Sequence, residues 1–165
     1  MFYHFLINGW IFNKINNIPK HSKIVDKFEQ GEIPTIDALI KYLQGSNLKD
    51  IVVVPTKELG FKHLKDTSIV SVGFSSKHIY KSAKDLIVEI KNLKIPEVSE
   101  NMLIYGRRDE EWLLVELGFD ISIYFFTEAF NKEVDIVNMW TNKPSDEDFI
   151  NENKLKNAFY KKKFK

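Results

Sequence analysis

Residues 69–79 carry the sequence IVSVGFSSKHI, in which β-favouring residues are followed by a glycine, two serines and the start of a helical pattern. The run Ile69–Val72 predicts a strand, and Gly73 permits the turn that follows it. Ser75 and Ser76 are both suited to cap a helix. The apolar positions of that helix recur at helical spacing and are Ile79, Ala83, Leu86, Ile87 and Ile90.

The segments before this unit predict one more helix and one more strand. Thr35 is placed to cap a helix that Gly45 would end. The apolar face of this helix comprises Ile36, Leu39, Ile40 and Leu43. The run Ile51–Val54, closed by Pro55, then predicts a strand that is buried on both faces.

The second half of the chain is richer in strand signals. Trp112–Leu117 and Ile121–Phe126 are short apolar runs, and Gly118–Asp120 between them is typical of a tight hairpin. The segment Val134–Trp140 is ambiguous between strand and helix. Together these elements predict a single α/β domain with a four- to five-stranded mixed sheet flanked by helices.

Both faces of the strand at Ile121–Phe126 are apolar. Alternation sends Ser122, Tyr124 and Phe126 to one face, and Ile121, Ile123 and Phe125 to the other. One face can form the core, and the other requires a cover. The pattern leaves open whether that cover is a helix of the same chain, a second copy in a homodimer or another partner.

Composition excludes several classes of protein. The chain has 165 residues, enough for one ordinary core, and a net charge of +1, which gives no strong field for polyanions. It contains no cysteine, so disulfide scaffolds, thiolate catalysis and Cys-based zinc sites are absent. No apolar run reaches the roughly 18 to 20 residues of a membrane span.

The two ends of the chain differ from its centre. Residues 1–24 mix aromatic and aliphatic residues with Lys14, Lys20 and Lys23, and the first acid is Asp26. This pattern is typical of a mitochondrial targeting segment, although such segments are usually rich in Arg and Ser, so an ordered extension is the alternative. We therefore expect an N-terminal extension at 1–33, a domain at 34–142 and a polar C-terminal extension at 143–165.

Residues that could carry chemistry are few. The four histidines lack the spacing of metal ligands, and the serines after Gly73 lack the Gly-x-Ser-x-Gly frame of a nucleophile elbow. Asp146 and Asp148 lie in a polar tail that would not hold two carboxylates rigid. No metal or cofactor site is expected.

The turn at Gly73–His78 has two interpretations. It would place backbone N–H groups together with Lys77 and His78 at a helix N-terminus, where a phosphate of ribosomal RNA could bind. The alternative is a turn with a purely structural role, since a single glycine is a weak signal for a phosphate site. A general RNA-binding module is disfavoured by the near-neutral charge.

Three stretches, in this order, resemble the ribosome-silencing-factor family, which comprises bacterial RsfS, plastid iojap and mitochondrial large-subunit assembly proteins. Residues 49–53, KDIVV, are similar to the family's x-D-I-V-V-L-D strand, and residues 71–79, SVGFSSKHI, to A-T-G-T-S-S-R-H-V. Residues 111–118, EWLLVELG, resemble D-W-V-L-V-D-L-G, and residues 135–140, DIVNMW, a closing E-L-E-K-L-W. The resemblance covers roughly residues 35–142.

The resemblance implies a nucleotidyltransferase-like fold without transfer chemistry, and a non-enzymatic factor that docks on the large ribosomal subunit. Its partner would be protein fourteen of that subunit, and docking would assist late assembly or block subunit joining. Carried over by motif, Trp112 would be an apolar anchor and Glu116 a carboxylate facing a basic side chain. Tyr124 and Phe125 on the adjoining strand complete the interface that we expect.

The long terminal extensions favour an organellar member located in the mitochondrial matrix. The mitochondrial members are similar to proteins that recruit an acyl-carrier-protein module, so this module is a second expected partner. The family pattern has Arg at the position of Lys77, Thr at that of Phe74 and His at that of Ile123. These departures keep the strand and helix chemistry but put the details of the interface in doubt.

A second function class is a nucleotidyltransferase-like enzyme. It would use the Gly73–Lys77 turn as its phosphate loop and would require a pair of carboxylates on the sheet to hold magnesium. Glu116 and Asp120 are the candidate pair. The ribosome-binding class predicts no turnover of nucleotide.

Overall fold

The computed structural model describes residues 28–96 and 98–142. The chain divides into two compact units, Met1–Val134 and Asp135–Lys165. The first unit holds the sheet and helices α2 to α5, and the described part of the second is helix α6 (Ile136–Thr141). The segment that was ambiguous in the sequence is therefore helical from Ile136 onward. The N-terminal segment 1–24 and the acidic pair Asp146 and Asp148 lie outside the described residues.

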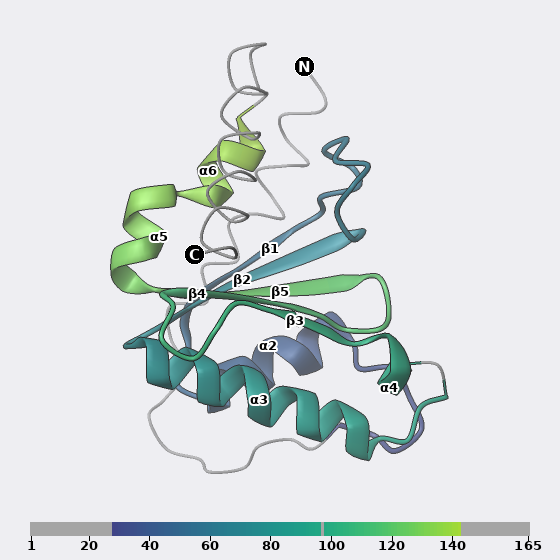
Figure 1. Ribbon diagram of the computed structural model, residues 1–165. Helices are drawn as coiled ribbons and strands as arrows, with labels where there is room; N and C mark the ends of the chain where they lie inside the picture. The colour runs from purple at the N-terminus through teal and green to yellow at the C-terminus, as the bar shows by residue number, and fades with distance from the viewer. Residues whose placement is uncertain (1–27, 97, 143–165) are drawn as a thin grey trace. The chain divides into compact units, whose positions relative to one another are not determined.

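The sheet has five strands in the order β1-β2-β5-β4-β3. The strands are β1 (Lys49–Val54), β2 (Thr67–Gly73), β3 (Leu103–Tyr105), β4 (Trp112–Glu116) and β5 (Ile121–Thr127). The central pair β2–β5 is parallel, and the other three pairs are antiparallel. The predicted single α/β domain with a mixed sheet is confirmed, as is the tight hairpin between β4 and β5 (Figure 1).

Two helices begin at the caps that the sequence predicts. Helix α2 (Ile36–Gly45) starts after Thr35, whose Oγ1 accepts a hydrogen bond from the Ala38 N–H at 3.2 Å. Helix α3 (Ser76–Asn92) starts after Ser75, whose Oγ accepts from the His78 N–H at 3.2 Å. Each hydroxyl satisfies a backbone donor that the helix itself leaves without a partner.

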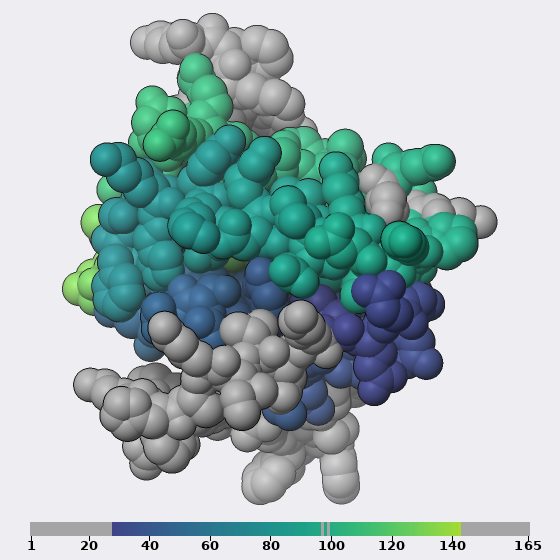
Figure 2. Space-filling model, turned by 90° about the horizontal axis from the view of Figure 1, so that it is seen from below, coloured from purple at the N-terminus to yellow at the C-terminus, as the bar shows by residue number. Residues whose placement is uncertain are grey.

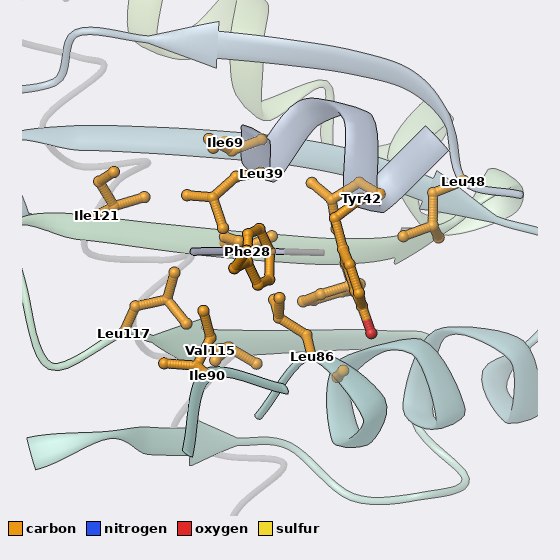
Figure 3. Close-up of a cluster of buried hydrophobic side chains, with 14 of the residues drawn as sticks. Phe28, Leu39, Tyr42, Leu48, Ile69, Leu86, Ile90, Val115, Leu117 and Ile121 are labelled. Atoms are coloured by element: carbon orange, nitrogen blue, oxygen red, sulfur yellow. The ribbon is translucent and has the colours of Figure 1, made fainter. Parts of the chain in front are cut away.

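Helices α2 and α3 cover one side of the sheet, which we call the helix side, with an apolar core between the helices and the strands (Figures 1 and 3). Figure 2 shows the outer surfaces of these two helices next to each other. The fully buried side chains of this core include Leu39, Leu43, Ile69, Ile79, Leu86, Ile90, Leu113, Ile123 and Phe125. Burial of these side chains removes apolar area from water and supplies the main driving force for folding.

The other side of the sheet, the opposite side, is also buried over much of its area. Helix α5 (Glu128–Val134) packs on β5 and β2, and the Phe130 and Phe126 rings lie 5.1 Å apart between centroids. Phe126 is completely buried, and so are Val70 and Val72 on the neighbouring strand. A helix of the same chain therefore covers part of the second apolar face, which was one of the alternatives left open by the sequence.

The structure corrects one expectation and adds a detail to another. The strand at Ile51–Val54 is not buried on both faces, because β1 is an edge strand and only Val54 in this run is fully buried. Its register shifts between Lys49 and Val52, where Asp50 has a left-handed φ of 48°. Helix α2 ends at Gly45 as expected, but the left-handed residue of its C-terminal turn is Asn47, at φ 60°.

Three short elements were not predicted. They are β3, α4 (Val98–Asn101) and α5, of three, four and seven residues. None is long enough to show a hydrophobic period that differs from chance. No helix within the described ranges is long and apolar enough to cross a membrane.

Candidate functional site

Strands β4 and β5 bring together most of the predicted interface residues. The antiparallel register pairs Trp112 with Phe126, Leu114 with Tyr124, and Glu116 with Ser122. Paired residues share one face of a sheet, so all six side chains belong to the opposite side. Trp112, Glu116 and Tyr124 therefore lie on one surface, as the interface prediction requires.

The exposure of these residues increases toward the edge strand. Tyr124 and Trp112 are only 5% and 7% exposed, whereas Leu114 and Glu116 are partly exposed. On β3, Leu103 pairs with Glu116 and is 50% exposed, and Tyr105 pairs with Leu114 and is partly exposed. We call Leu103, Tyr105, Leu114 and Glu116 the β3–β4 strip. It is a partly apolar surface with one carboxylate, and Trp112 lies at the end of its β4 row.

Sequence reasoning missed the β3 half of this strip. The run Leu103–Tyr105, between Asn101 and Gly106, is a β-favouring triplet between turn residues, and this was the available signal. Three residues are too few for a period-2 pattern to stand out.

Phe125 does not belong to this surface. Its side chain is completely buried and packs in the core on the helix side, with Ile123 and Leu113. Strand alternation places it on the face away from Tyr124. In this arrangement Phe125 presents no atoms to a partner and supports the surface from beneath.

A cluster of buried hydroxyls lies under the Glu116 end of the opposite side. Thr56 Oγ1 donates to the Lys65 carbonyl at 2.6 Å and lies 3.3 Å from Ser68 Oγ. Burial raises the pKa of the Tyr124 phenol well above its usual range, the charge of Glu116 raises it further, and a hydrogen bond with Ser68 acts in the other direction. The Tyr124 phenol is therefore a protonated hydrogen-bonding group near neutral pH.

The second predicted group, Lys77 and His78, lies in the first turn of α3, directly after the turn that follows β2. Lys77 is exposed, whereas both ring nitrogens of His78 have partners within the chain. The Phe74 N–H donates to His78 Nδ1 at 3.1 Å, and His78 Nε2 lies 2.8 Å from the Ser46 carbonyl. His78 therefore connects two backbone segments of the chain. Because both of its ring nitrogens are occupied, it cannot make the contact with an external anion that the sequence predicted.

Gly73 makes this close packing feasible. A Cβ at this position would lie 2.5 Å from Ile79 Cγ2 and 3.0 Å from His78 Nδ1. A side chain here would force the buried Ile79 side chain to move and would crowd the His78 ring. Glycine is required at this turn by the close approach of neighbouring atoms, which is the structural interpretation of the motif.

The geometry does not support the nucleotidyltransferase alternative. Gly73 aligns with Thr127 of β5, whereas Glu116 aligns with Ser122. Five residues along a strand correspond to roughly 17 Å, so the turn and the carboxylate lie at opposite ends of the sheet. One phosphate with its metal ion spans only a few ångströms. Among the residues that the structure describes, no group of three or more His, Asp or Glu is placed to hold a metal ion.

Comparisons with known proteins identify a family. The family model described as "Ribosomal silencing factor during starvation" matches residues 29–164. No curated protein matches the chain.

Two solved structures resemble the chain in part. A crystal structure of a Chromobacterium violaceum protein is 26% identical, covers 64% of this chain and 83% of its own, and has a TM-score of 0.48. A crystal structure of a Bacillus halodurans protein is 17% identical, covers 61% of this chain and 88% of its own, and has a TM-score of 0.49.

Proposed function

Because its sequence matches the family model over residues 29–164, the chain belongs to the ribosomal silencing factor family, and we propose that it docks on the large ribosomal subunit through the β3–β4 strip. Proteins of this family are non-enzymatic factors that bind protein fourteen of the large subunit, uL14. Docking at that protein would regulate assembly of the large subunit or its joining with the small subunit.

The observation that carries the proposal is the partial exposure of apolar side chains around a single carboxylate. Leu103 keeps half of its surface exposed beside Glu116, and Leu114 follows on the same face. Apolar anchors around a charged group are typical of protein interfaces, where the charge selects a partner of opposite sign. A basic side chain of the ribosomal protein is the expected partner of Glu116.

The buried aromatic residues have a different part in this proposal. Trp112 and Tyr124 are almost fully buried, so they hold the strip in place. Substitution of Trp112 by Ala would weaken binding and folding together. Glu116 and Leu103 are better probes, because their side chains are exposed enough to change without loss of the core.

The test is sedimentation of the purified chain with purified large subunits through a sucrose gradient. We expect the parent chain to travel with free large subunits and to be absent from joined ribosomes. Glu116→Lys is expected to weaken binding at least tenfold, because it sets a cation against the partner's basic group. The matched control is Glu58→Lys, the same charge change at an exposed residue of the loop between β1 and β2.

Equal binding by Glu116→Lys and the parent chain would show that the docking surface lies elsewhere. Leu103→Asp provides an independent check on the apolar half of the strip. Thermal unfolding of each variant shows whether a loss of binding reflects a loss of fold. If the parent chain stays at the top of the gradient at low salt, the proposal itself fails.

The proposed compartment is the mitochondrial matrix. Support comes from residues 1–24, which carry lysines and no acid. Residues 1–33 fused to a fluorescent protein are expected to direct it to mitochondria, and a diffuse cytosolic signal would contradict this. Affinity capture of the full chain from the matrix also tests the acyl-carrier-protein module and a second copy of the chain as partners.

A further inference from the structure

Phe74 is the most exposed large apolar side chain in the part of the chain that the structure describes. It keeps 69% of its surface exposed, compared with 52% for Val88 and Ile33. It lies between the end of β2 and the start of α3. The family pattern that this segment resembles has a threonine at the same position, so the fold does not require an aromatic ring there.

The Phe74 ring is held in place from one side by His78. The two rings stack with centroids 5.3 Å apart and planes inclined by 19°. His78 is itself fixed at both nitrogens, because Nδ1 accepts from the Phe74 N–H and Nε2 donates to the Ser46 carbonyl. This pair of bonds requires the neutral tautomer with its proton on Nε2. An aromatic ring that is ordered before binding loses little entropy when a partner contacts it.

The surroundings of the ring are cationic. Lys49 Nζ lies 5.8 Å from the Phe74 ring centroid, and the exposed Lys77 lies in the first turn of α3, which contains no acid. Lys49 also contacts Glu128 at 3.2 Å, and Lys132 approaches the same carboxylate at 3.8 Å. The hydrogen bond from Lys49 is the main cause that lowers the pKa of Glu128. Lys49 thus shares the Glu128 carboxylate with Lys132, and the exposed Asp50 follows Lys49 in the chain, whereas Lys77 has no acid in its own helical turn.

We propose that Phe74 stacks on an unpaired base of ribosomal RNA, with Lys49 and Lys77 contacting the flanking phosphates. The inference rests on the proposed function as a large-subunit binder and assigns a second contact outside the β3–β4 strip. An exposed ring next to lysines is the arrangement by which proteins bind single-stranded nucleic acid without reading its sequence. A protein partner is less favoured, because the contacts of the ring are with an imidazole and an ammonium group, not with an apolar patch.

The experiment combines two titrations of the full chain. The first measures the fluorescence anisotropy of a short fluorescein-labelled single-stranded RNA, and the second measures pelleting with large subunits. Phe74→Thr, which installs the residue of the family pattern, is expected to weaken RNA binding about tenfold and subunit binding in the same direction. Val88→Thr removes a similarly exposed apolar side chain from α3 and is expected to change neither by more than about twofold.

Two further variants sharpen the test. Phe74→Trp enlarges the stacking surface and is expected to match or exceed the parent chain in RNA binding. Lys77→Glu is expected to weaken RNA binding and to reduce its dependence on salt, because one phosphate contact is lost. Both positions are exposed, and thermal unfolding is expected to be unchanged in all of these variants.

The outcomes separate this inference from the proposed function. Glu116→Lys should lose subunit binding and keep RNA binding, whereas Phe74→Thr should weaken both. If Phe74→Thr binds RNA as tightly as the parent chain does, stacking on a base is excluded. If that variant also binds large subunits more weakly than the parent, Phe74 contacts a protein instead. If the parent chain does not pellet with large subunits, the proposed function fails, and the RNA titration still decides whether Phe74 stacks on bases.

Discussion

On the helix side of the sheet, β5 contributes Ile121, Ile123 and Phe125, whereas on the opposite side it contributes Ser122, Tyr124 and Phe126. The helix side packs into one apolar core. The opposite side mixes aromatic residues with buried hydroxyls and ends in the partly exposed β3–β4 strip. Both faces bury hydroxyls, since Ser71 on the helix side donates to the Tyr124 carbonyl, but the opposite side also holds the Thr56–Ser68 pair and keeps an open edge for the proposed partner.

The largest effect is expected on the helix side. Phe125→Ala removes a fully buried ring from a core that cannot collapse around the gap, and it should lower the free energy of unfolding by about 3–5 kcal/mol. Denaturant unfolding measures the loss, and the exposed Phe74→Ala is the control with nearly unchanged stability. A loss below about 1 kcal/mol would mean that the Phe125 ring is not packed as the structure has it.

A smaller effect is expected for the hydroxyl cluster on the opposite side. Thr56→Val keeps the shape of the side chain but removes the donor to the Lys65 carbonyl and the contact with Ser68. The free energy of unfolding should fall by about 1–3 kcal/mol, because the partly buried Lys65 carbonyl and the buried Ser68 hydroxyl each lose a partner. Thr56→Ser keeps the hydroxyl and should retain most of the stability. Equal losses in both variants would assign the effect to packing and make the two sides of the sheet alike.

Much of the fold could be predicted from short patterns in the sequence. The caps Thr35 and Ser75 and the hairpin at 118–120 follow from local chemistry, and all three are confirmed. The place of β1 at the edge of the sheet and the existence of β3 could not be predicted. Both depend on the order of the strands, which local patterns do not specify.

The candidate site was predictable only in part. Alternation placed Tyr124 and Phe125 on opposite faces, yet the motif resemblance grouped them in one interface. The structure keeps Tyr124 on the side of Trp112 and Glu116 and assigns Phe125 to the core. Sequence reasoning also gave His78 a direct role, because the Ser46 carbonyl, 32 residues away, is not visible from the motif.

The pH dependence of stability provides a third comparison. On the helix side, burial raises the pKa of Tyr42 to about 12, with smaller contributions from Glu89 and Asp85. In the unfolded chain the pKa of a tyrosine is about 10. Between these two pH values the unfolded chain loses this proton and the folded chain keeps it, so the free energy of unfolding falls as the pH rises.

Unfolding by urea at several pH values from 9 to 12 measures this slope. Tyr42→Phe should flatten it, and the remaining slope includes Tyr124 and Lys57, whose pKa values are also raised. An unchanged slope in Tyr42→Phe would assign the alkaline loss to other groups.

The smallest effect is expected on the outer surface of the helix layer. Val88 is 52% exposed on α3, and Val88→Ala exchanges a β-branched residue for the best helix former. The free energy of unfolding should change by less than about 0.5 kcal/mol, with a slight gain from helix propensity. A loss above about 1 kcal/mol in thermal or urea unfolding would show that Val88 has a packing role.

The parallel pairing of β2 with β5 has a consequence for how the chain folds during synthesis. The Ser71 hydroxyl and the Tyr124 carbonyl that it contacts are 53 residues apart in sequence. Strand β2 can pair with β1 early, but its other edge waits until β5 has left the ribosome. A nascent chain that stops before Ile121 would present an apolar unpaired edge, and such edges promote aggregation. A protein proposed to act on ribosomes thus depends on its own complete synthesis for its central strand pair.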